Sequence, residues 1–321
     1  MNVLVKGAGV AGLSVAHELT SRGARVTLLD PQPGSRAAAS WFAGGMLAPY
    51  CERESAEQAV VELGLGAADW WKAALPGSVT HNGTLVLAPV RDVRELERFG
   101  SRTSEFEWAN EDTVATLEPD LAGRFRKGLF FKDEAHLDPR HVLISLAAKL
   151  AAAGVAFETD PVRTATAGFD WTVQCTGYSR DDQTIRGVRG EMLIVRTIDI
   201  ALSRPVRLVH PRFPIYVVPR ADHTFMVGAT MLESDSAGPI TVRSMMELLN
   251  AAYSLHPAFG EAEIVETGVG IRPAYPDNLP RVVREGKTIS INGLYRHGFL
   301  LAPAMAMLVA DMVLNERRAT R

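Results

Sequence analysis

The chain has 321 residues, which is enough for one large domain or two closely joined ones. Hydrophobic residues make up 47% of the chain and charged residues 22%, an ordinary balance for a globular protein. The formal net charge of −3 excludes the strongly basic surface of a nucleic-acid-binding protein. The two cysteines, Cys51 and Cys175, lack metal-ligand spacing and fit a reducing compartment, so we expect a cytoplasmic protein without a metal site.

Neither of the apolar segments that resemble targeting signals favours a membrane protein. The sequence MNVLVKGAGV lacks the basic leader and the long apolar run of a signal peptide. The longest apolar stretch, residues 298–314, contains Pro303 and Asp311 and is too short for a comfortable membrane span. We interpret it as a buried helix and expect neither a membrane nor a nucleic acid as a partner.

The first 30 residues carry a dinucleotide-binding pattern. A short buried strand over residues 2–6 leads into the GxGxxG pattern of Gly7, Gly9 and Gly12, and a helix and a second strand ending at Asp30 follow. Gly7 permits a tight turn, Gly9 lets the backbone approach a pyrophosphate, and Gly12 allows the helix to pack closely on the strand. The helix N-terminus attracts phosphate, and Asp30 can accept hydrogen bonds from a ribose. The pattern fits NAD as well as FAD, and a tight turn without a ligand is the alternative.

A second cluster of small residues follows, with the sequence AAASWFAGGMLAP over residues 37–49. Gly44 and Gly45 lie at its centre. Small side chains let the main chain lie close to a flat ring, and its N–H groups can bond the N5 and O4 edge of a flavin. A flexible surface loop is the alternative, but the aromatic residues, methionine and leucine in this stretch favour a buried loop.

Two helices are predicted before the middle of the chain. Residues 55–74 are expected to form one helix that ends in Trp70 and Trp71, which we place in the core. A second helix follows Asp138, its expected N-cap, with Pro139 at the first helical position.

A strand over residues 169–179 is expected to return the chain to the first sheet. It runs into Thr176 and Gly177, a small pair that suits a position beside a cofactor. Cys175 has no adjacent cation, so we expect a buried and unreactive thiol. His136 precedes the second helix, and we assign it a packing or turn role.

From Val188 the pattern changes to alternating strands, with a hairpin turn near Asp222 and His223 and a helix over residues 241–255. The fold class is α/β (α+β overall), a Rossmann-like domain with a discontinuous second domain built on a mainly antiparallel sheet. The predicted boundaries are as follows: a cofactor-binding domain of residues 1–80, 130–185 and 270–321, and a substrate-binding domain of residues 81–129 and 186–269.

Five segments resemble a known family, and they occur in the family's order over nearly the whole chain. They are the N-terminal fingerprint, FAGGML, YVVPR with MVGATM, GIRPAYPDNLP and GLYRHGFLLAPA. Together they resemble the D-amino-acid oxidase family of FAD enzymes, and within it the glycine oxidases of thiamine biosynthesis. The resemblance implies noncovalent FAD and oxidative deamination of glycine or a similarly small amino acid, with hydride transfer from the α-carbon to flavin N5. Dioxygen then yields hydrogen peroxide.

The same resemblance implies partners and site residues. Relatives form homo-oligomers, so a homo-oligomer is expected, and the imine product is implied to pass to a thiazole-synthesis enzyme. The residues implied to bind FAD are Gly7, Gly9, Val10, Ala11, Gly12, Asp30, Pro31, Ala39, Ser40, Ala43, Gly44, Gly45, Met46, Val162, Thr176, Gly177, Tyr295, Arg296, His297, Gly298, Phe299 and Leu300.

Four residues are predicted to form the catalytic site. An arginine can bind a substrate carboxylate through two parallel hydrogen bonds, a bidentate pair. The resemblance places Arg272 in that role, and a structural salt bridge is the alternative. Tyr216 can donate a hydrogen bond to the same carboxylate or pack in the core. Met231 is expected to line the substrate cavity, and Arg296 to lie near both substrate and flavin. No catalytic acid or base is required. Some glycine oxidases carry a histidine where this chain has Pro214, which leaves the substrate preference open.

The last predicted helix begins without a side-chain cap. We place its start near Ala302, with Pro303 in the first turn and the N–H groups of residues 298–301 directed at the flavin. His297 is expected to act through its backbone. Three other functions stay open: an oxidase or dehydrogenase of sarcosine, D-alanine or D-proline, an NAD-dependent dehydrogenase, and a flavoprotein without turnover.

Overall fold

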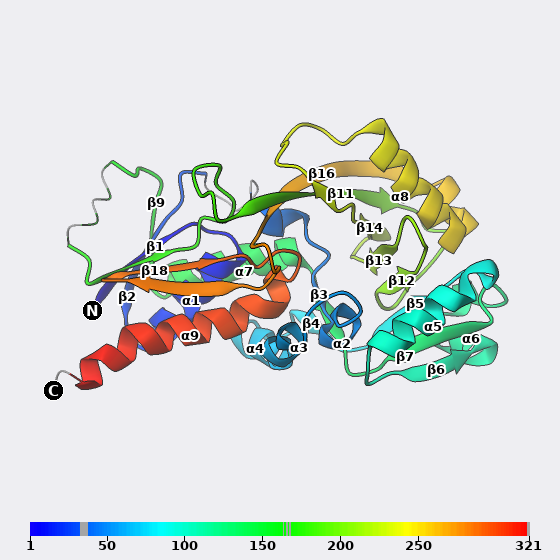
Figure 1. The fold of residues 1–321 in the computed structure, drawn as a ribbon, viewed down its shortest axis with the longest axis horizontal. Helices are drawn as coiled ribbons and strands as arrows, with labels where there is room; N and C mark the ends of the chain where they lie inside the picture. The colour runs from blue at the N-terminus through cyan, green and yellow to red at the C-terminus, as the bar shows by residue number, and fades with distance from the viewer. Residues whose placement is uncertain (33–37, 163, 165, 167, 320–321) are drawn as a thin grey trace.

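The structure is a computed structural model that describes residues 1–32, 38–162, 164, 166 and 168–319. Figure 1 shows an elongated molecule with a parallel sheet at one end, a mainly antiparallel sheet at the other, and both termini at the end that holds the parallel sheet. This arrangement agrees with the predicted fold class.

The parallel sheet has β1 (Asn2–Lys6) near its centre, between β2 and β10. Val3, Leu4 and Val5 are fully buried, as expected for a strand covered on both faces. The strand β17 is antiparallel to β18, and the other pairs are parallel. The order across the sheet is β17 (Arg281–Glu285), β18 (Thr288–Asn292), β10 (Trp171–Gln174), β1, β2 (Arg25–Leu29) and β9 (Ala156–Glu158).

Helix α1 (Val10–Ser21) packs against both α7 (Pro139–Ala152) and α9 (Gly298–Ala319). The predicted cap of α7 is confirmed, since the Asp138 carboxylate accepts hydrogen bonds from the N–H groups of Arg140 and His141 at 2.9 and 3.2 Å.

The prediction of one helix over residues 55–74 is wrong. The structure has two helices, α3 (Gln58–Gly64) and α4 (Ala67–Ala74), with a break after Gly64. A Cβ atom on Gly64 would lie 2.8 Å from the Leu300 side chain, so the glycine lets α3 pack closely against α9. The core position of Trp71 is confirmed, because it is fully buried.

The predicted start of the last helix near Ala302 is also wrong. Helix α9 begins at Gly298, so Pro303 lies inside the helix and not in its first turn. A proline in a helix leaves the carbonyl four residues earlier without its usual donor, here that of Phe299. The Trp71 indole N–H donates to this carbonyl at 2.8 Å, so the carbonyl keeps a hydrogen-bond donor.

The mainly antiparallel sheet is dominated by two long strands, β11 (Arg186–Arg196) and β16 (Glu263–Ala274), which pair along their whole length. The hairpin predicted at Asp222 and His223 is confirmed between β13 and β14, with both turn residues at positive φ. The order across the sheet is β15 (Leu232–Glu233), β11, β14 (Thr224–Gly228), β13 (Ile215–Pro219), β12 (Val206–Leu208), β5 (Thr84–Leu87), β7 (Lys127–Phe131) and β6 (Glu107–Asn110), and β16 pairs with β11 outside this order.

Three helices accompany this second sheet. Helix α8 (Val242–Leu255) begins after the N-cap Thr241 and packs on β11, β13 and β14. Helices α5 (Val93–Arg102) and α6 (Glu111–Leu117) pack on β7, at the far end of the sheet in Figure 1.

A small third sheet joins the two ends of the molecule. Its strands are β3 (Met46–Leu47), β8 (Ala135–Leu137) and β4 (Val79–Thr80), and the short helix α2 (Pro49–Glu52) follows β3. Strand β7 crosses one predicted domain boundary and β16 another, and the division at those residues stays a prediction.

Within the described residues, one helix passes the length and composition test for crossing a membrane. Its window Gly298–Asn315 has a mean hydropathy of 1.7, and 56% of it is buried. It packs on α1, α3 and α4, which is the environment of a core helix.

Candidate active site

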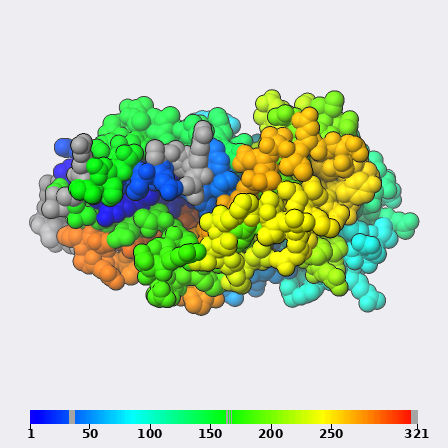
Figure 2. All heavy atoms as spheres, turned by 90° about the horizontal axis from the view of Figure 1, so that it is seen from above, coloured from blue at the N-terminus to red at the C-terminus, as the bar shows by residue number. Residues whose placement is uncertain are grey.

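Two adjoining cavities lie where the sheets meet. The cofactor-side cavity has a volume of about 440 Å³ and the substrate-side cavity about 320 Å³. Figure 2 shows dark-blue N-terminal atoms recessed between two groups of green atoms, with yellow and orange atoms of the other end of the molecule beside them. The residues that line both cavities are Ala43, Gly44, Tyr216, Arg272, Arg296, Gly298 and Phe299.

The N-terminal glycine turn forms one wall of the cofactor-side cavity. Gly7 adopts φ = 98°, a conformation that favours glycine, and a Cβ atom on Gly12 would overlap the Gly7 carbonyl oxygen. Gly12 is therefore needed for packing. Gly9 faces the cavity, where its backbone is open to a ligand.

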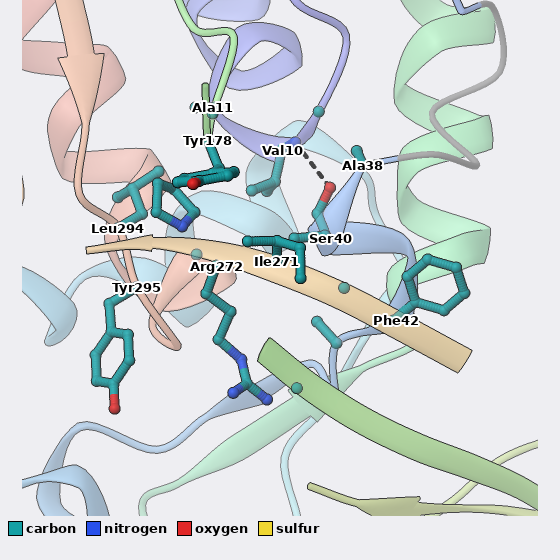
Figure 3. Close-up of a pocket in the computed structure, with 18 of the residues that line it drawn as sticks. Val10, Ala11, Ala38, Ser40, Phe42, Tyr178, Ile271, Arg272, Leu294 and Tyr295 are labelled. Carbon is teal, nitrogen blue, oxygen red and sulfur yellow. Dashed lines mark hydrogen bonds between the residues drawn. The ribbon is translucent and has the colours of Figure 1, made fainter. Parts of the chain in front are cut away.

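The start of α1 is turned toward the same cavity. The helix has no side-chain N-cap bond from Gly9, and the Val10 N–H lies 3.3 Å from the Ser40 hydroxyl (Figure 3). The Asp30 carboxylate accepts the N–H groups of Ala8 at 2.7 Å and Gln32 at 2.9 Å, which fixes it at the cavity edge. The arrangement presents helix N–H groups and a fixed carboxylate, as the sequence pattern predicted.

The start of α9 forms the opposite wall. The first-turn N–H groups of Gly298, Phe299 and Leu300 have no intrahelical acceptor. The Leu301 N–H, in contrast, donates to the backbone carbonyl of His297 at 2.8 Å. The expectation that residue 301 offers a free donor is therefore wrong, because the helix begins earlier than predicted.

The Gly44–Gly45 pair has two separate roles. Gly44 lies against the Tyr216 ring, and a Cβ atom there would lie 2.7 Å from the ring. Gly45 lines only the substrate-side cavity, and a Cβ atom there would overlap the Leu137 carbonyl oxygen. Its glycine is required by the packing of β3 on β8.

Arg272 is the central cation between the two cavities (Figure 3). Its guanidinium lies over Gly190, whose missing side chain leaves the necessary space, and Nη1 donates to the Thr230 carbonyl at 3.0 Å. Within the described residues it makes no ion pair, and burial lowers its pKa. A half-buried guanidinium without a carboxylate partner is prepared to bind an anion from the cavity. The salt-bridge alternative therefore does not hold for the described residues.

The other predicted catalytic residues surround Arg272. Burial raises the pKa of Tyr216, so its hydroxyl keeps its proton and can donate. Met231 is 49% exposed at the substrate-side cavity, with its sulfur 3.5 Å from both the Tyr295 hydroxyl and Arg296 Nη1. The structure thus brings Tyr216, Met231, Arg272 and Arg296 together.

The sequence analysis missed a buried carboxylate, Glu52, that contacts two arginines and a histidine beside the substrate-side cavity. Glu52 Oε2 lies 2.9 Å from Arg296 and 3.2 Å from His297 Nδ1, and Oε1 bonds Arg207. Burial raises the pKa of Glu52, but Arg296 and Arg207 outweigh this and hold the pKa well below its ordinary value. Burial lowers the pKa of His297. The His297 side chain therefore has a partner, contrary to the expectation that it acts only through its backbone.

A second buried acid, Glu134, also lies near Arg207. It accepts the Cys51 N–H at 2.7 Å, and burial raises its pKa to about 7 in spite of Arg207. Since the folded-state pKa lies above the ordinary value of 4.5, the protein loses stability as the pH rises from about 4.5 to about 7.

Glu134→Gln is therefore expected to stabilise the protein at pH 8 by up to about 3 kcal/mol, because it removes the cost of ionising a buried acid. The gain is expected to shrink as the pH falls toward 5. Urea denaturation at both pH values measures it, with Glu107→Gln on the surface as the control. An equal change in the free energy of unfolding at both pH values would contradict the raised pKa of Glu134.

Some predicted residues lie outside the cavities. Pro31 is exposed, and Val162 is 87% exposed, and neither lines a cavity, so their assignment to FAD stays a prediction. Residue 37, the first of the small-residue stretch, lies outside the described residues. Burial raises the pKa of Cys175 to about 12, which confirms an unreactive thiol. Burial and Arg220 lower the pKa of His136 to about 4, in agreement with a packing role.

The fold and the two cavities define an oxidoreductase with a dinucleotide cofactor. The profile described as "DAO: FAD dependent oxidoreductase" matches residues 2–312. The chain belongs to this family of FAD-dependent oxidoreductases.

Relatives support the family assignment, and a solved structure shares the fold. A protein of Rhizobium etli, provisionally named thiamine biosynthesis oxidoreductase ThiO, is 61% identical over 99% of this chain and 98% of its own. Glycine oxidase of Bacillus licheniformis is 28% identical over 98% of this chain and 93% of its own. The crystal structure of glycine oxidase from Geobacillus kaustophilus superposes with a TM-score of 0.79 at 23% identity, over 98% of this chain and 94% of the other.

The residues of the cofactor-side cavity fit FAD. The free helix starts of α1 and α9 supply donors for anionic groups, and the Gly9 and Gly298 positions leave backbone open to the cavity. The residues that would hold FAD are those of the glycine turn with Asp30, residues 38–40 and 42–44, Thr176 and Gly177, and residues 294–296, 298 and 299.

Gly298→Val is expected to weaken FAD binding. A Cβ atom at Gly298 would lie 3.3 Å from Val10, so a branched side chain forces apart the two helix starts, at a cost of about 1–3 kcal/mol. The ratio of flavin to protein absorbance measures the loss. Gly66→Val, in open space, is the matched control, and unchanged flavin content in Gly298→Val would contradict the assignment.

Proposed function

We propose that the protein is a glycine oxidase, which converts glycine and dioxygen to the imine and hydrogen peroxide, and that the imine hydrolyses to glyoxylate and ammonia. The observation that carries the proposal is Arg272, a half-buried cation without an ion-pair partner among the described residues, placed at the junction of the FAD cavity and a small second cavity. The names of the relatives in Rhizobium and Bacillus support the same reaction and its place in thiamine biosynthesis.

The substrate carboxylate binds Arg272, and the Tyr216 hydroxyl donates a second hydrogen bond to it. This fixes the α-carbon at the boundary of the two cavities, and orientation of this kind is worth several orders of magnitude in rate. FAD, when bound, supplies the two-electron acceptor.

The cations also act on the substrate amine. Arg272 and Arg296 both line the cavity, and nearby positive charge disfavours an ammonium group. The neutral amine, which is the form that can be oxidised, is therefore favoured without a dedicated base. Glu52 does not serve as that base, because its oxygens are occupied by Arg207, Arg296 and His297.

One observation favours a second candidate substrate class. The substrate-side cavity of about 320 Å³ is larger than glycine, and Pro214 and the half-exposed Met231 line it. Small N-methyl or D-amino acids such as sarcosine, D-alanine or D-proline are the alternative substrates.

A substrate panel with peroxide detection tests the proposal. The purified protein is expected to show a flavin spectrum, which glycine bleaches in the absence of dioxygen. A flavin spectrum with no bleaching by any small amino acid would instead favour a protein without turnover, and no flavin at all would reject the proposal.

Location and assembly complete the proposal. We propose a cytoplasmic homo-oligomer that passes its imine to a thiazole-synthesis enzyme. The two buried free cysteines support a reducing compartment. Size-exclusion chromatography with light scattering tests the oligomer.

A further inference from the structure

A buried ion pair lies directly behind Arg272. On strand β11, the side chains of Arg189 and Glu191 point to one face, and Gly190 between them opens to the other face, where the Arg272 guanidinium lies. Arg189 and Glu191 line neither cavity of the active site. Their side chains are only 5% and 0% exposed.

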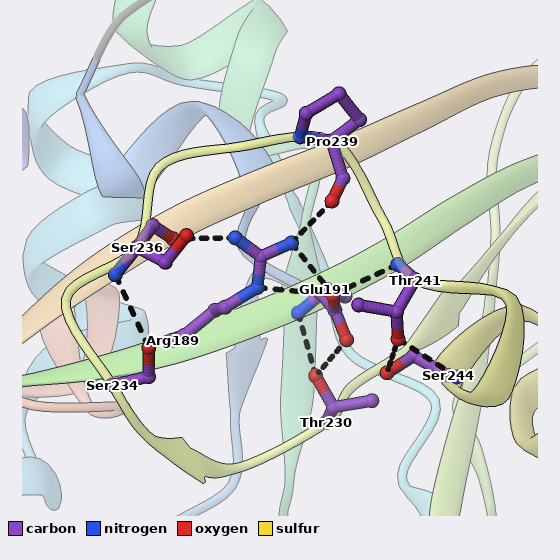
Figure 4. Close-up of polar contacts among 8 residues, drawn as sticks. All are labelled: Arg189, Glu191, Thr230, Ser234, Ser236, Pro239, Thr241 and Ser244. Carbon is purple, nitrogen blue, oxygen red and sulfur yellow. Dashed lines mark hydrogen bonds and ion pairs between the residues drawn. The ribbon is translucent and has the colours of Figure 1, made fainter.

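This pair is fully hydrogen-bonded, as Figure 4 shows. Arg189 Nε and Nη2 donate to Glu191 Oε1 at 3.0 and 2.7 Å, and Nη2 also donates to the Pro239 carbonyl at 2.6 Å. Nη1 donates to the Ser236 carbonyl. Burying an ion pair in this way adds little net stability, so stability alone does not account for it.

Thr230 connects the pair to Arg272. Its hydroxyl donates to Glu191 Oε2 at 3.0 Å and accepts the Glu191 N–H at 2.9 Å, while the Thr230 N–H donates to the Glu191 carbonyl at 3.2 Å. The Thr230 carbonyl in turn accepts Arg272 Nη1 at 3.0 Å. Its neighbours Ala229 and Met231 both line the substrate-side cavity.

Arg189 also holds a loop over the cofactor-side cavity. The carbonyls that it binds, those of Ser236 and Pro239, flank Ala237, which lines that cavity. The residue before Ser236 is held as well, because the Tyr178 hydroxyl donates to the Asp235 carboxylate at 3.0 Å.

We propose that Arg189 and Glu191 are positioning residues for the active site. Through Thr230 they fix the direction of the Arg272 guanidinium, and through Ser236 and Pro239 they hold the loop of Ala237. A guanidinium fixed before binding loses less side-chain entropy when the carboxylate arrives, so affinity rises. The inference rests on the proposed role of Arg272 as the carboxylate partner.

Thr230→Val tests the connection, because it keeps the branched shape and removes the hydroxyl. The dissociation constant of acetate, measured by the change it causes in the visible spectrum of the FAD-loaded protein, is expected to rise about tenfold. KM for glycine is expected to rise by a similar factor, with kcat within about twofold. Thr230→Ser keeps the hydroxyl and is expected to restore both values.

Thr241→Val is the matched control, because Thr241 belongs to the same cluster but touches neither Thr230 nor Arg272. Its hydroxyl bonds Ser244 and caps α8, so the variant is expected to lower Tm and leave acetate binding unchanged. An equal loss of acetate affinity in Thr241→Val would overturn the proposal. So would a Thr230→Val protein with lower Tm and unchanged acetate affinity.

Glu191→Gln gives a second measurement, since it keeps the shape of the side chain and is expected to weaken acetate binding in the same direction. Acetate binding requires no turnover. A wild-type protein that binds acetate but oxidises no glycine would therefore reject the proposed function and leave the positioning test in force. Wild-type protein that binds no acetate would reject the positioning role together with that of Arg272.

Discussion

Arg272→Ala is expected to lower kcat/KM for glycine by about 100- to 1,000-fold, because it removes the partner of the substrate carboxylate. The free protein should lose little stability or gain some, since the half-buried guanidinium is partly desolvated and makes no ion pair among the described residues. Steady-state peroxide formation measures the first effect and urea denaturation the second.

Two further variants sharpen this result. Arg272→Lys keeps the charge but loses the planar fork, so it is expected to recover only part of the activity. Arg281→Ala, on the exposed strand β17, is the control for loss of an arginine outside the site. Wild-type kcat/KM in Arg272→Ala would remove the basis of the proposed function.

Glu52→Ala is expected to cost about 3–5 kcal/mol of the free energy of unfolding. The change leaves Arg207 and Arg296, whose side chains are only 14% and 21% exposed, without the carboxylate that both of them contact. Urea denaturation at pH 7 measures the loss. Arg296 also loses the contact that orients it at the cavity, so the variant is expected to bind glycine more weakly as well.

The pH dependence gives Glu52 a second signature. The folded-state pKa of Glu52 lies well below the ordinary value. Its contribution to the free energy of unfolding is therefore complete above the unfolded-state pKa and is lost as the pH falls through the folded-state pKa. The difference in the free energy of unfolding between wild type and Glu52→Ala should therefore decrease only at acidic pH. The control is Glu107→Ala, which breaks an exposed pair with Lys132 and is expected to cost under about 1 kcal/mol. Equal costs for the two variants would contradict the role of Glu52.

The sequence predicted those parts of the fold that local patterns determine. The glycine turn with Asp30, the Asp138 cap and the hairpin at Asp222 each depend on a few adjacent residues with strict backbone demands. The predicted α/β class followed from the same local signals. Arg272 and Tyr216 were assigned by resemblance, and the structure places both at the junction of the cavities.

The errors arose where distant residues decide the local structure. Pro303 indicated a helix start, but Trp71 supplies the donor that lets the helix run through the proline. Glu52 looks like an ordinary surface acid in its own segment. Only the fold brings it to Arg207 and Arg296, which lie more than 150 residues away. Thr230 has no sequence signal at all, because its role lies in the direction of one carbonyl.

The packing of α9 on α1 has a consequence for the order of events at the ribosome. The apolar face of α1 is synthesised within the first 21 residues, but the helix that covers it begins at Gly298. Of the two strands beside β1, one (β10) is likewise delayed until Trp171. A growing chain therefore exposes this surface until α9 is made, and it cannot assemble the cavity for FAD before residues 294–299 have emerged. Over that interval the uncovered apolar surface is open to the aggregation that partly folded chains suffer.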